Sequence, residues 1–238
     1  MLIYGINPVV EALRAGRLTA IRVSSRADER VAAAVALAEK HGVPVRRVPA
    51  AELDRATRGA PHQGVVADLS DAQVTSVEDL VAQAKGVPLI VVLDGIEDPH
   101  NVGAILRTVD AAGADGLVRQ SRHAAPLGGA AAKASAGAVA HVKVAEVVNI
   151  ARALEALKAM GVWTVGLAGD ARKQYQDIDF RLPTALVVGG EGSGLRRLVR
   201  ERCDWLASIP LHGHVQSLNA SVATGVVLFE AIRQRSLK

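Results

Sequence analysis

Three short stretches of the chain concentrate polar side chains at spacings that could support binding or catalysis. Residues 94–108 read DGIEDPHNVGAILRT and include Asn101 and Arg107. Residues 189–195 read GGEGSGL and place Glu191 among four glycines. Residues 217–221 read SLNAS. Amides, hydroxyls, a carboxylate and a guanidinium can all hold a polar ligand by hydrogen bonds, so each stretch is a candidate site.

The first stretch follows a run of five apolar residues, LIVVL at 89–93, and therefore begins at the carboxyl end of a predicted buried strand. Asn101 is expected to cap the helix that follows, because its side chain can accept from the first free N–H groups. Apolar residues at 102, 105, 106 and 109 have the spacing of a core-facing stripe, which Arg107 is expected to flank rather than point to solvent. Open α/β sheets bind ligands at this edge, which makes residues 94–108 a predicted ligand site.

The glycine-rich stretch at 189–195 shares only its composition with nucleotide-binding loops. Neither G-x-G-x-x-G nor a P-loop sequence can be placed on it. Glycine lets backbone N–H groups approach a ligand closely, which favours a ligand-binding turn over a solvent-exposed one, although both interpretations remain open. Glu191 would repel a phosphate, so the loop is predicted to meet a neutral or cationic ligand.

The third stretch, SLNAS, carries three side chains that can form hydrogen bonds at the start of a predicted helix. One of them is needed as the helix cap. The others have no structural duty in a helix that is otherwise apolar, so they are predicted to contact a ligand.

Other reactive side chains support weaker hypotheses. Cys203 is the single cysteine and is predicted to pack at a helix end rather than act as a nucleophile. His212 and His214 could suggest a metal, but no third ligand lies at a useful spacing, so no metal is expected. His100 could be a general base, although a role in the turn is favoured because nothing near it in the sequence completes a triad.

The composition favours a soluble globular protein in a reducing cytoplasm. Half of the 238 residues are hydrophobic, and neither a membrane span nor a signal peptide is expected. A single cysteine excludes intramolecular disulfides. The net charge of +4, with 21 arginines and 7 lysines, gives weak support for a nucleic-acid partner. Aromatic residues make up only 3%, which argues against recognition by an aromatic stacking platform.

Residues 1–70 alternate short strands and helices and are predicted to form a small α/β unit. Asn7 followed by proline indicates a helix start with Asn7 as the cap. Strands are expected at 21–24, 45–48 and 64–69, and helices at 29–41 and 51–57. Four arginines lie in or next to the strand expected at 45–48 and the helix expected at 51–57. They form either a solvated face or an RNA-contacting patch: Arg46, Arg47, Arg55 and Arg58. Residues 70–76 are polar and are predicted to begin a linker.

The remaining chain continues the alternation. Ser76 is expected to cap a helix that ends near Lys85, and further strands are expected at 116–118, 162–167, 185–188 and 206–209. Helices are expected at 150–160, at 196–202 and from about 219 to 235. This order predicts a mostly parallel sheet with helices on both faces. The small-residue segment 127–140 permits close packing, with Lys133 solvated or facing phosphate. The predicted division is 1–70, a linker and leading helix at 71–86, and 87–238.

Three segments together resemble the SpoU (TrmH-type) RNA ribose 2′-O-methyltransferases of the SPOUT class. They are DPHNVGAILRT at 98–108, VVGGEGSGL at 187–195 and IPLHGHVQSLNASVATGVVLFEA at 209–231. The opening IYGINPV, the HQG at 62–64 and the ending FEAIRQR resemble the branch that modifies a guanosine of large-subunit (23S) ribosomal RNA. The resemblance implies an N-terminal substrate-binding α/β domain like ribosomal protein L30e and a C-terminal α/β domain with a deep trefoil knot.

The resemblance also implies which residues form the site. Catalytic positions match Asn101, Arg107, Glu191, Ser217 and Asn219. The positions that hold S-adenosylmethionine match Gly189, Ile209 and Leu218. Two residues depart from the family pattern, Gly190 and Gln216, and Gln216 could alter substrate contacts.

The implied reaction is methyl transfer from S-adenosylmethionine to a ribose 2′-hydroxyl of 23S ribosomal RNA. The implied assembly is a homodimer with the site at the subunit interface, where Arg107 serves the partner's cofactor. Arg107 would act either as a base assisted by an RNA phosphate or as an electrostatic stabiliser of the alkoxide. The alternatives are a methyltransferase for transfer RNA or another ribosomal site, and an RNA-binding module without catalysis.

Overall fold

The computed structural model describes residues 1–25, 29–70 and 75–237, and the chain forms two compact units. The first unit comprises Met1–Gln73 together with Pro126–His141, and the second comprises Val74–Ala125 together with Val142–Lys238. The predicted boundaries did not anticipate that residues 126–141 would join the first unit. Residues 71–74, within the predicted linker, lie outside the described residues.

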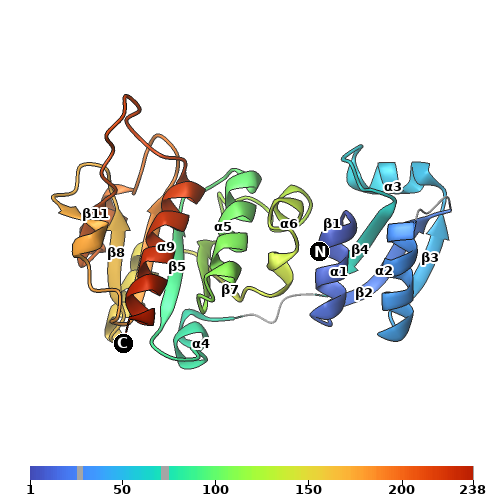
Figure 1. Ribbon diagram of the computed structural model, residues 1–238, viewed down its shortest axis with the longest axis horizontal. Coiled ribbons are helices and arrows are strands. Elements are labelled where there is room, and N and C mark those ends of the chain that lie inside the picture. The colour runs from blue at the N-terminus through green and yellow to red at the C-terminus, as the bar shows by residue number, and fades with distance from the viewer. Residues whose placement is uncertain (26–28, 71–74, 238) are drawn as a thin grey trace. The chain divides into compact units, whose positions relative to one another are not determined.

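The first unit is built on a four-stranded mixed sheet in the order β1-β4-β2-β3 (Figure 1). Strand β4 runs antiparallel to β1 and β2, and β2 runs parallel to β3. Its elements are β1 (Leu2–Tyr4), α1 (Ile6–Arg14), β2 (Leu18–Ser24), α2 (Glu29–Lys40), β3 (Val45–Val48), α3 (Ala50–Thr57), β4 (Val65–Leu69), α6 (Ala130–Ala134) and the 3-10 helix η1 (Ala138–Ala140).

The predicted cap at Asn7 is wrong, because α1 begins at Ile6, two residues earlier than predicted. Gly5 occupies the cap position with φ of 93°, a conformation that favours glycine. Its missing side chain is replaced by Gln63, whose Oε1 accepts from the Ile6 backbone N–H at 3.0 Å. Pro8 lies inside the first turn, where a missing N–H leaves no helical bond unmade. The HQG turn and the GINP segment are therefore joined.

The small-residue segment packs against the first part of this unit. Lys133 Nζ donates to the Pro61 carbonyl at 3.1 Å, and the His141 ring lies 3.2 Å from a Glu11 carboxylate oxygen. A Cβ on Gly137 would lie 2.5 Å from the Glu11 side chain, so the close approach requires glycine there. Lys133 is exposed, in agreement with the solvated interpretation, and its bond to a backbone carbonyl is an additional contact.

The second unit contains a seven-stranded sheet in the order β7-β6-β5-β10-β8-β11-β9. Every neighbouring pair is parallel, which confirms the predicted α/β class. Its strands are β5 (Leu89–Asp94), β6 (Gly116–Gln120), β7 (Val144–Val147), β8 (Trp163–Leu167), β9 (Lys173–Gln174), β10 (Thr184–Gly189) and β11 (Trp205–Ser208). Its helices are α4 (Val77–Ala82), α5 (Pro99–Ala111), α7 (Ile150–Ala159), α8 (Arg197–Arg202) and α9 (Ala220–Ser236), with the 3-10 helix η2 (Tyr175–Asp177).

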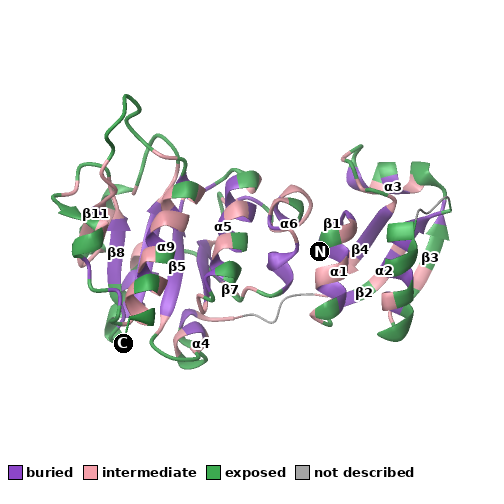
Figure 2. Cartoon of the chain, in the orientation of Figure 1, coloured by how far each residue is buried: buried purple, intermediate pink, exposed green. Residues whose placement is uncertain are grey.

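Helices cover both faces of this sheet. Helices α5 and α9 pack together on one face (Figure 1), and residues of α4, α7 and α8 form a buried cluster with the strands on the other. The central strands are accordingly buried (Figure 2). Ser76 caps α4 as predicted, in a reciprocal pair with Asp79, although α4 ends at Ala82 rather than near Lys85. Over the described ranges, no helix has both the length and the apolarity to cross a bilayer.

The C-terminal end of α9 is fastened to the loops at the amino ends of the central strands. Arg235 donates to the carbonyls of Val87, Pro88, Phe180 and Leu182. Gln234 accepts from the Phe180 N–H and donates to the Ile178 carbonyl. The FEAIRQR ending therefore has a structural role here.

Candidate active site

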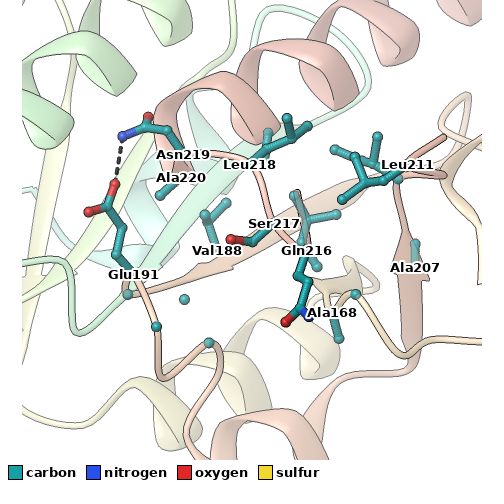
Figure 3. Close-up of a pocket in the computed structure, with 18 residues that line it drawn as sticks. Ala168, Val188, Glu191, Ala207, Leu211, Gln216, Ser217, Leu218, Asn219 and Ala220 are labelled. Atoms are coloured by element: carbon teal, nitrogen blue, oxygen red, sulfur yellow. Dashed lines mark hydrogen bonds between the residues drawn. The ribbon is translucent and has the colours of Figure 1, made fainter. Parts of the chain in front are cut away.

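A pocket of about 660 Å³ opens at the carboxyl edge of the second unit's sheet. In a parallel sheet the loops that follow the strands share one edge, and the order β5-β10-β8-β11 brings four of them side by side. The pocket is lined by the loops after β8, β10 and β11 and by the start of α9 (Figure 3). Two of the three predicted stretches, 189–195 and 217–221, line it, and the third, in the loop after β5, adjoins it through Asn101.

Asn101, Glu191 and Asn219 form a hydrogen-bonded cluster at the mouth of this pocket. Glu191 Oε1 accepts from Asn101 Nδ2 at 3.0 Å and from Asn219 Nδ2 at 2.6 Å, the latter visible in Figure 3. Asn219 Nδ2 also lies 2.8 Å from Asn101 Oδ1. Two amides thus fix one carboxylate oxygen, and charge-assisted bonds of this kind are stronger than neutral ones.

The predicted role of Asn101 as a helix cap is wrong. Asp98 caps α5, accepting from the backbone N–H groups of His100 at 3.0 Å and Asn101 at 3.3 Å, with Pro99 at the first helical position. This arrangement leaves the Asn101 side chain free to donate to Glu191. His100 contributes its backbone N–H to the turn.

Asn219 caps α9 and belongs to the site at the same time. Its Oδ1 accepts from the backbone N–H groups of Ser221 at 2.9 Å and Val222 at 3.4 Å, while its Nδ2 donates to Glu191. The sequence argument had given these duties to different residues of the SLNAS stretch. One amide performs both because its oxygen and nitrogen point in different directions.

The glycine-rich loop after β10 is folded tightly and tied to the end of β5. A Cβ on Gly189 would lie 2.2 Å from the Gly194 carbonyl carbon, so no larger residue fits. The Gly190 N–H donates to the Asp94 carbonyl at 3.0 Å. The buried Asp94 carboxylate also accepts from the Arg196 backbone N–H at 2.8 Å and from its Nε at 2.7 Å. Asp94 and Arg196, which the sequence analysis did not single out, therefore hold the loop that carries Glu191.

The pocket suits a large ligand with apolar surfaces and a positive charge near Glu191. Leu167, Val188, Ile209, Leu211 and Leu218 supply apolar surface, and glycines expose backbone. Of the residues that line it, Glu191 is the one that bears a charge. An adenosine and a sulfonium cation match this donor set, because the carboxylate favours positive charge and the wall accepts an apolar ring. S-adenosylmethionine therefore fits the residues present.

The predicted site residues fall into two groups. Those that line the pocket are Gly189, Glu191, Ile209, Ser217, Leu218 and Asn219, together with the departing residues Gly190 and Gln216. Asn101 reaches it through Glu191. Arg107 does not line it.

Arg107 is exposed on α5, so the expectation that it flanks the core-facing stripe is wrong. Each helical residue turns about 100° around the axis, which places Arg107 roughly 150° from the centre of the stripe at 102, 105, 106 and 109. Across the described residues, its guanidinium forms no hydrogen bond or ion pair. An exposed, unpaired arginine on this helix is available to a partner.

Two other groups are accounted for. Burial raises the pKa of the Cys203 thiol to about 12, and its Sγ contacts the Val199 carbonyl at 3.3 Å, in agreement with a packing role. His212 and His214 are exposed loop residues. In the part of the chain that the structure describes, no three His, Cys, Asp or Glu side chains gather as a metal site would require.

Comparison with known proteins gives consistent matches over the whole chain. Residues 88–229 match the model of the SpoU rRNA Methylase family, and residues 2–75 match one described as RNA 2′-O ribose methyltransferase substrate binding. The chain is 45% identical over 242 residues to the 23S rRNA (guanosine-2′-O-)-methyltransferase RlmB of Pseudomonas syringae pv. tomato, covering 99% of this chain and 96% of that protein. It is 41% identical over 243 residues to the putative TrmH family tRNA/rRNA methyltransferase YacO of Bacillus subtilis, covering 98% and 96%.

A solved structure shares the fold over nearly the full length. The SpoU methyltransferase AviRb from Streptomyces viridochromogenes, in complex with the cofactor AdoMet, is similar with a TM-score of 0.83 and 28% identity. The match covers 99% of this chain and 90% of that chain.

Proposed function

The chain belongs to the SpoU rRNA Methylase family, and we propose that it methylates the ribose 2′-hydroxyl of a guanosine in 23S ribosomal RNA. It is an S-adenosylmethionine-dependent RNA methyltransferase. The observation that carries the proposed site is the Asn101–Glu191–Asn219 cluster at the mouth of a pocket that suits a cationic adenosine derivative.

The cofactor supplies an electrophilic methyl group on a sulfonium, and the protein positions it. Gly189, Ile209 and Leu218 hold the cofactor against the pocket wall. Glu191, fixed by the two amides, sets the orientation of the ribose, and the Ser217 hydroxyl supplies a further hydrogen bond. The methyl group moves from the sulfonium to the ribose oxygen, and the hydroxyl loses its proton. These residues offer no strong base, so the proton would pass to a nearby RNA phosphate or to water.

Arg107 completes the site by stabilising the negative charge that develops on the ribose oxygen. A guanidinium stays protonated at neutral pH, so electrostatic stabilisation suits it better than proton removal. Arg107 does not line the cofactor pocket of its own chain, so it is assigned to the cofactor pocket of a second copy.

The homodimer is supported by the surface of α9. One side of this helix packs on β10 and α5, yet the opposite side carries Val222, Val226 and Phe229 at i, i+4 and i+7. Phe229 is 52% exposed. A helix that is apolar on both sides is expected to be buried on both, and a second copy of the chain would cover the free side.

The test is incubation with labelled S-adenosylmethionine and unmodified 23S ribosomal RNA or transfer RNA, followed by mapping of the label. We expect label on the 2′-oxygen of a guanosine in 23S RNA. Label confined to transfer RNA would show that transfer RNA is the substrate. No label in either RNA would contradict the methyltransferase activity itself.

The choice of ribosomal RNA over transfer RNA is supported by residues 2–75, which match a substrate-binding model, and by the near-complete coverage of the Pseudomonas relative. The divisions at 70 and 86, the trefoil knot, the absence of a metal and the cytoplasmic location stay predictions. The single cysteine, held as a thiol, is compatible with a reducing compartment.

A further inference from the structure

A second hollow, of about 420 Å³, opens at the same carboxyl edge of the second unit's sheet. It lies where β6 and β7 end and where α7 and α8 begin. Its walls are formed by Gln120, residues 148–151 and residues 196–199. None of the predicted site residues lines it, so the proposed methyl-transfer chemistry leaves it without a role.

The hollow combines exposed apolar side chains with an exposed cation. Val148 is 80% exposed and Leu198 is 56% exposed, and both line the hollow. The Arg197 side chain is 78% exposed and pairs only with Glu201 of its own helix, at 2.9 Å. Such a surface pair is worth little, so an incoming anion can displace it.

Gln120 adds an amide that can adapt to a ligand. Its Oε1 is buried without a hydrogen-bond partner among the described residues. Buried polar atoms in proteins are nearly always paired, so the present orientation of this amide is not fixed by a hydrogen bond to its oxygen. Turning the amide toward a ligand breaks no hydrogen bond, and the amide can then donate to or accept from a base edge.

One short loop, residues 190–196, connects the wall of the hollow to the proposed active site. Arg196, on its wall, is held by the buried Asp94, whose carbonyl accepts from the Gly190 N–H at 3.0 Å. Glu191 follows Gly190 directly. Asp94 neutralises Arg196, which leaves Arg197 as the cation available to a ligand on this side of the loop.

We propose that this hollow binds an unpaired nucleotide of the RNA substrate, adjacent to the one that is methylated. Its phosphate contacts Arg197, and its base lies against Val148 and Leu198 with an edge toward Gln120. The assignment rests on the proposed RNA methyltransferase function. An anion combined with an apolar ring is the chemistry of a nucleotide, whereas a peptide of acidic residues would leave the apolar walls unused.

The first experiment compares Arg197→Gln with Arg202→Gln. Both are exposed arginines of α8 that pair with a glutamate, but Arg202 pairs with Glu155 outside the hollow. With 23S RNA transcripts and labelled S-adenosylmethionine, Arg197→Gln should raise KM about tenfold and leave kcat unchanged. It should also reduce the slope of log Kd against log salt by about 0.7, the value for one single-strand phosphate. Arg202→Gln should change neither.

The second experiment tests the apolar wall with Leu198→Ser and the matched control Leu182→Ser, another exposed leucine. Leu198→Ser should raise KM for the RNA several-fold without altering the salt slope, since no charge is lost. Calorimetric binding of S-adenosylmethionine and the thermal midpoint should match the wild type in both variants.

The outcomes separate this inference from the proposed function. If the wild type methylates RNA and both Arg197→Gln and Leu198→Ser keep its KM, the nucleotide subsite is wrong and the enzyme stands. If the wild type methylates no RNA, filter binding of the same transcript still measures the salt slope, and an unchanged slope for Arg197→Gln overturns the subsite. Equal loss of binding to polyglutamate and to RNA would show a general anion site and overturn the nucleotide assignment.

Discussion

Asn219 has two structural roles, for which the sequence analysis had expected two different residues. Asn219 ends the loop after β11, starts α9 and fixes Glu191, all with one amide. Helix capping and site geometry are therefore coupled at this residue, and replacing it with alanine would remove both. A substitution that keeps the cap but not the amide nitrogen separates them.

Asn219→Ser should retain the cap, because serine and asparagine cap equally well, and hold the free energy of unfolding within ~0.5 kcal/mol. Methyl transfer should fall by about 10²-fold, since Glu191 loses its shortest hydrogen bond. Urea unfolding and labelled-methyl transfer measure the two effects. As control, Ser76→Ala removes the α4 cap and should lower stability by about 1 kcal/mol with activity intact. Full activity in Asn219→Ser would show that its bond to Glu191 is dispensable.

Cys203 should be unreactive in the folded protein. Its pKa is raised from 9.0 to about 12 by burial, so the folded state disfavours the thiolate that alkylating reagents require. A raised pKa contributes stability below pH 9.0 that is lost as the pH rises toward 12. Iodoacetamide at pH 8.5 should modify Cys203 far more slowly in buffer than in urea, and equal rates would contradict the burial. Cys203→Ala should flatten the alkaline loss of stability.

At the scale of elements, α9 links the site to the opposite edge of the sheet. Its first residue follows the cap at Asn219, and near its last turn Arg235 binds four carbonyls of the loops before β5 and β10. Thr184 also donates to the Pro88 and Leu182 carbonyls, but only Arg235 joins all four carbonyls to α9. The helix is therefore held at both ends, which fixes the position of Asn219 in the pocket wall.

Arg235→Met should lower the free energy of unfolding by about 2–4 kcal/mol, because several charge-assisted hydrogen bonds disappear together. The matched control is Arg233→Met on the same helix, whose side chain is 59% exposed and makes one i, i+3 pair with Glu230, so it should lower stability much less than Arg235→Met. Chemical denaturation of the two variants provides the comparison. Similar losses in both would mean that the carbonyl cluster is not the anchor.

At the scale of the whole molecule, the proposed site needs residues from two copies of the chain. The pocket, Glu191 and Asn219 lie on one surface, while Arg107 lies exposed on α5 and outside the pocket. The proposed dimer brings the two together across the free apolar side of α9. Assembly and activity should therefore be lost together.

Mixing two inactive variants tests whether Arg107 acts on the partner's pocket. Arg107→Ala and Glu191→Ala should each lower transfer by ~10²–10³-fold while Arg107→Ala still binds S-adenosylmethionine. After subunit exchange, random heterodimers contain one intact site, which restores about one quarter of wild-type activity. No recovery would place Arg107 and Glu191 in the same subunit's site.

Phe229→Glu should produce a monomer, because a carboxylate at the centre of the apolar side of α9 cannot be buried without a partner. Sedimentation should report half the wild-type mass, and methyl transfer should be lost. A dimer that survives Phe229→Glu would move the interface away from α9.

The sequence by itself determined the elements and the residue types of the site. Runs such as 89–93 and the helical stripe on α5 depend on local periodicity, which is why the α/β class and most element positions could be predicted. Glu191 and Ser217 were candidates by residue type, whereas Ile209 and Leu218 came from the family resemblance. Errors occurred where two local signals competed. Asp98 and Gly5 took the cap positions expected for Asn101 and Asn7, and the angular position of Arg107 was misjudged although helix geometry alone could have given it.

Tertiary structure decided which of these residues meet. Asn101, Glu191 and Asn219 are far apart in the chain and come together only because β5 and β10 lie side by side in a sheet whose order does not follow the sequence. Long-range packing also places residues 126–141 in the first unit and forms the second hollow beside α8. Local periodicity contains no information about either. Strand order is set by how the buried faces of the elements pack together. Local sequence patterns therefore identify candidate site residues, whereas packing determines which of them come into contact.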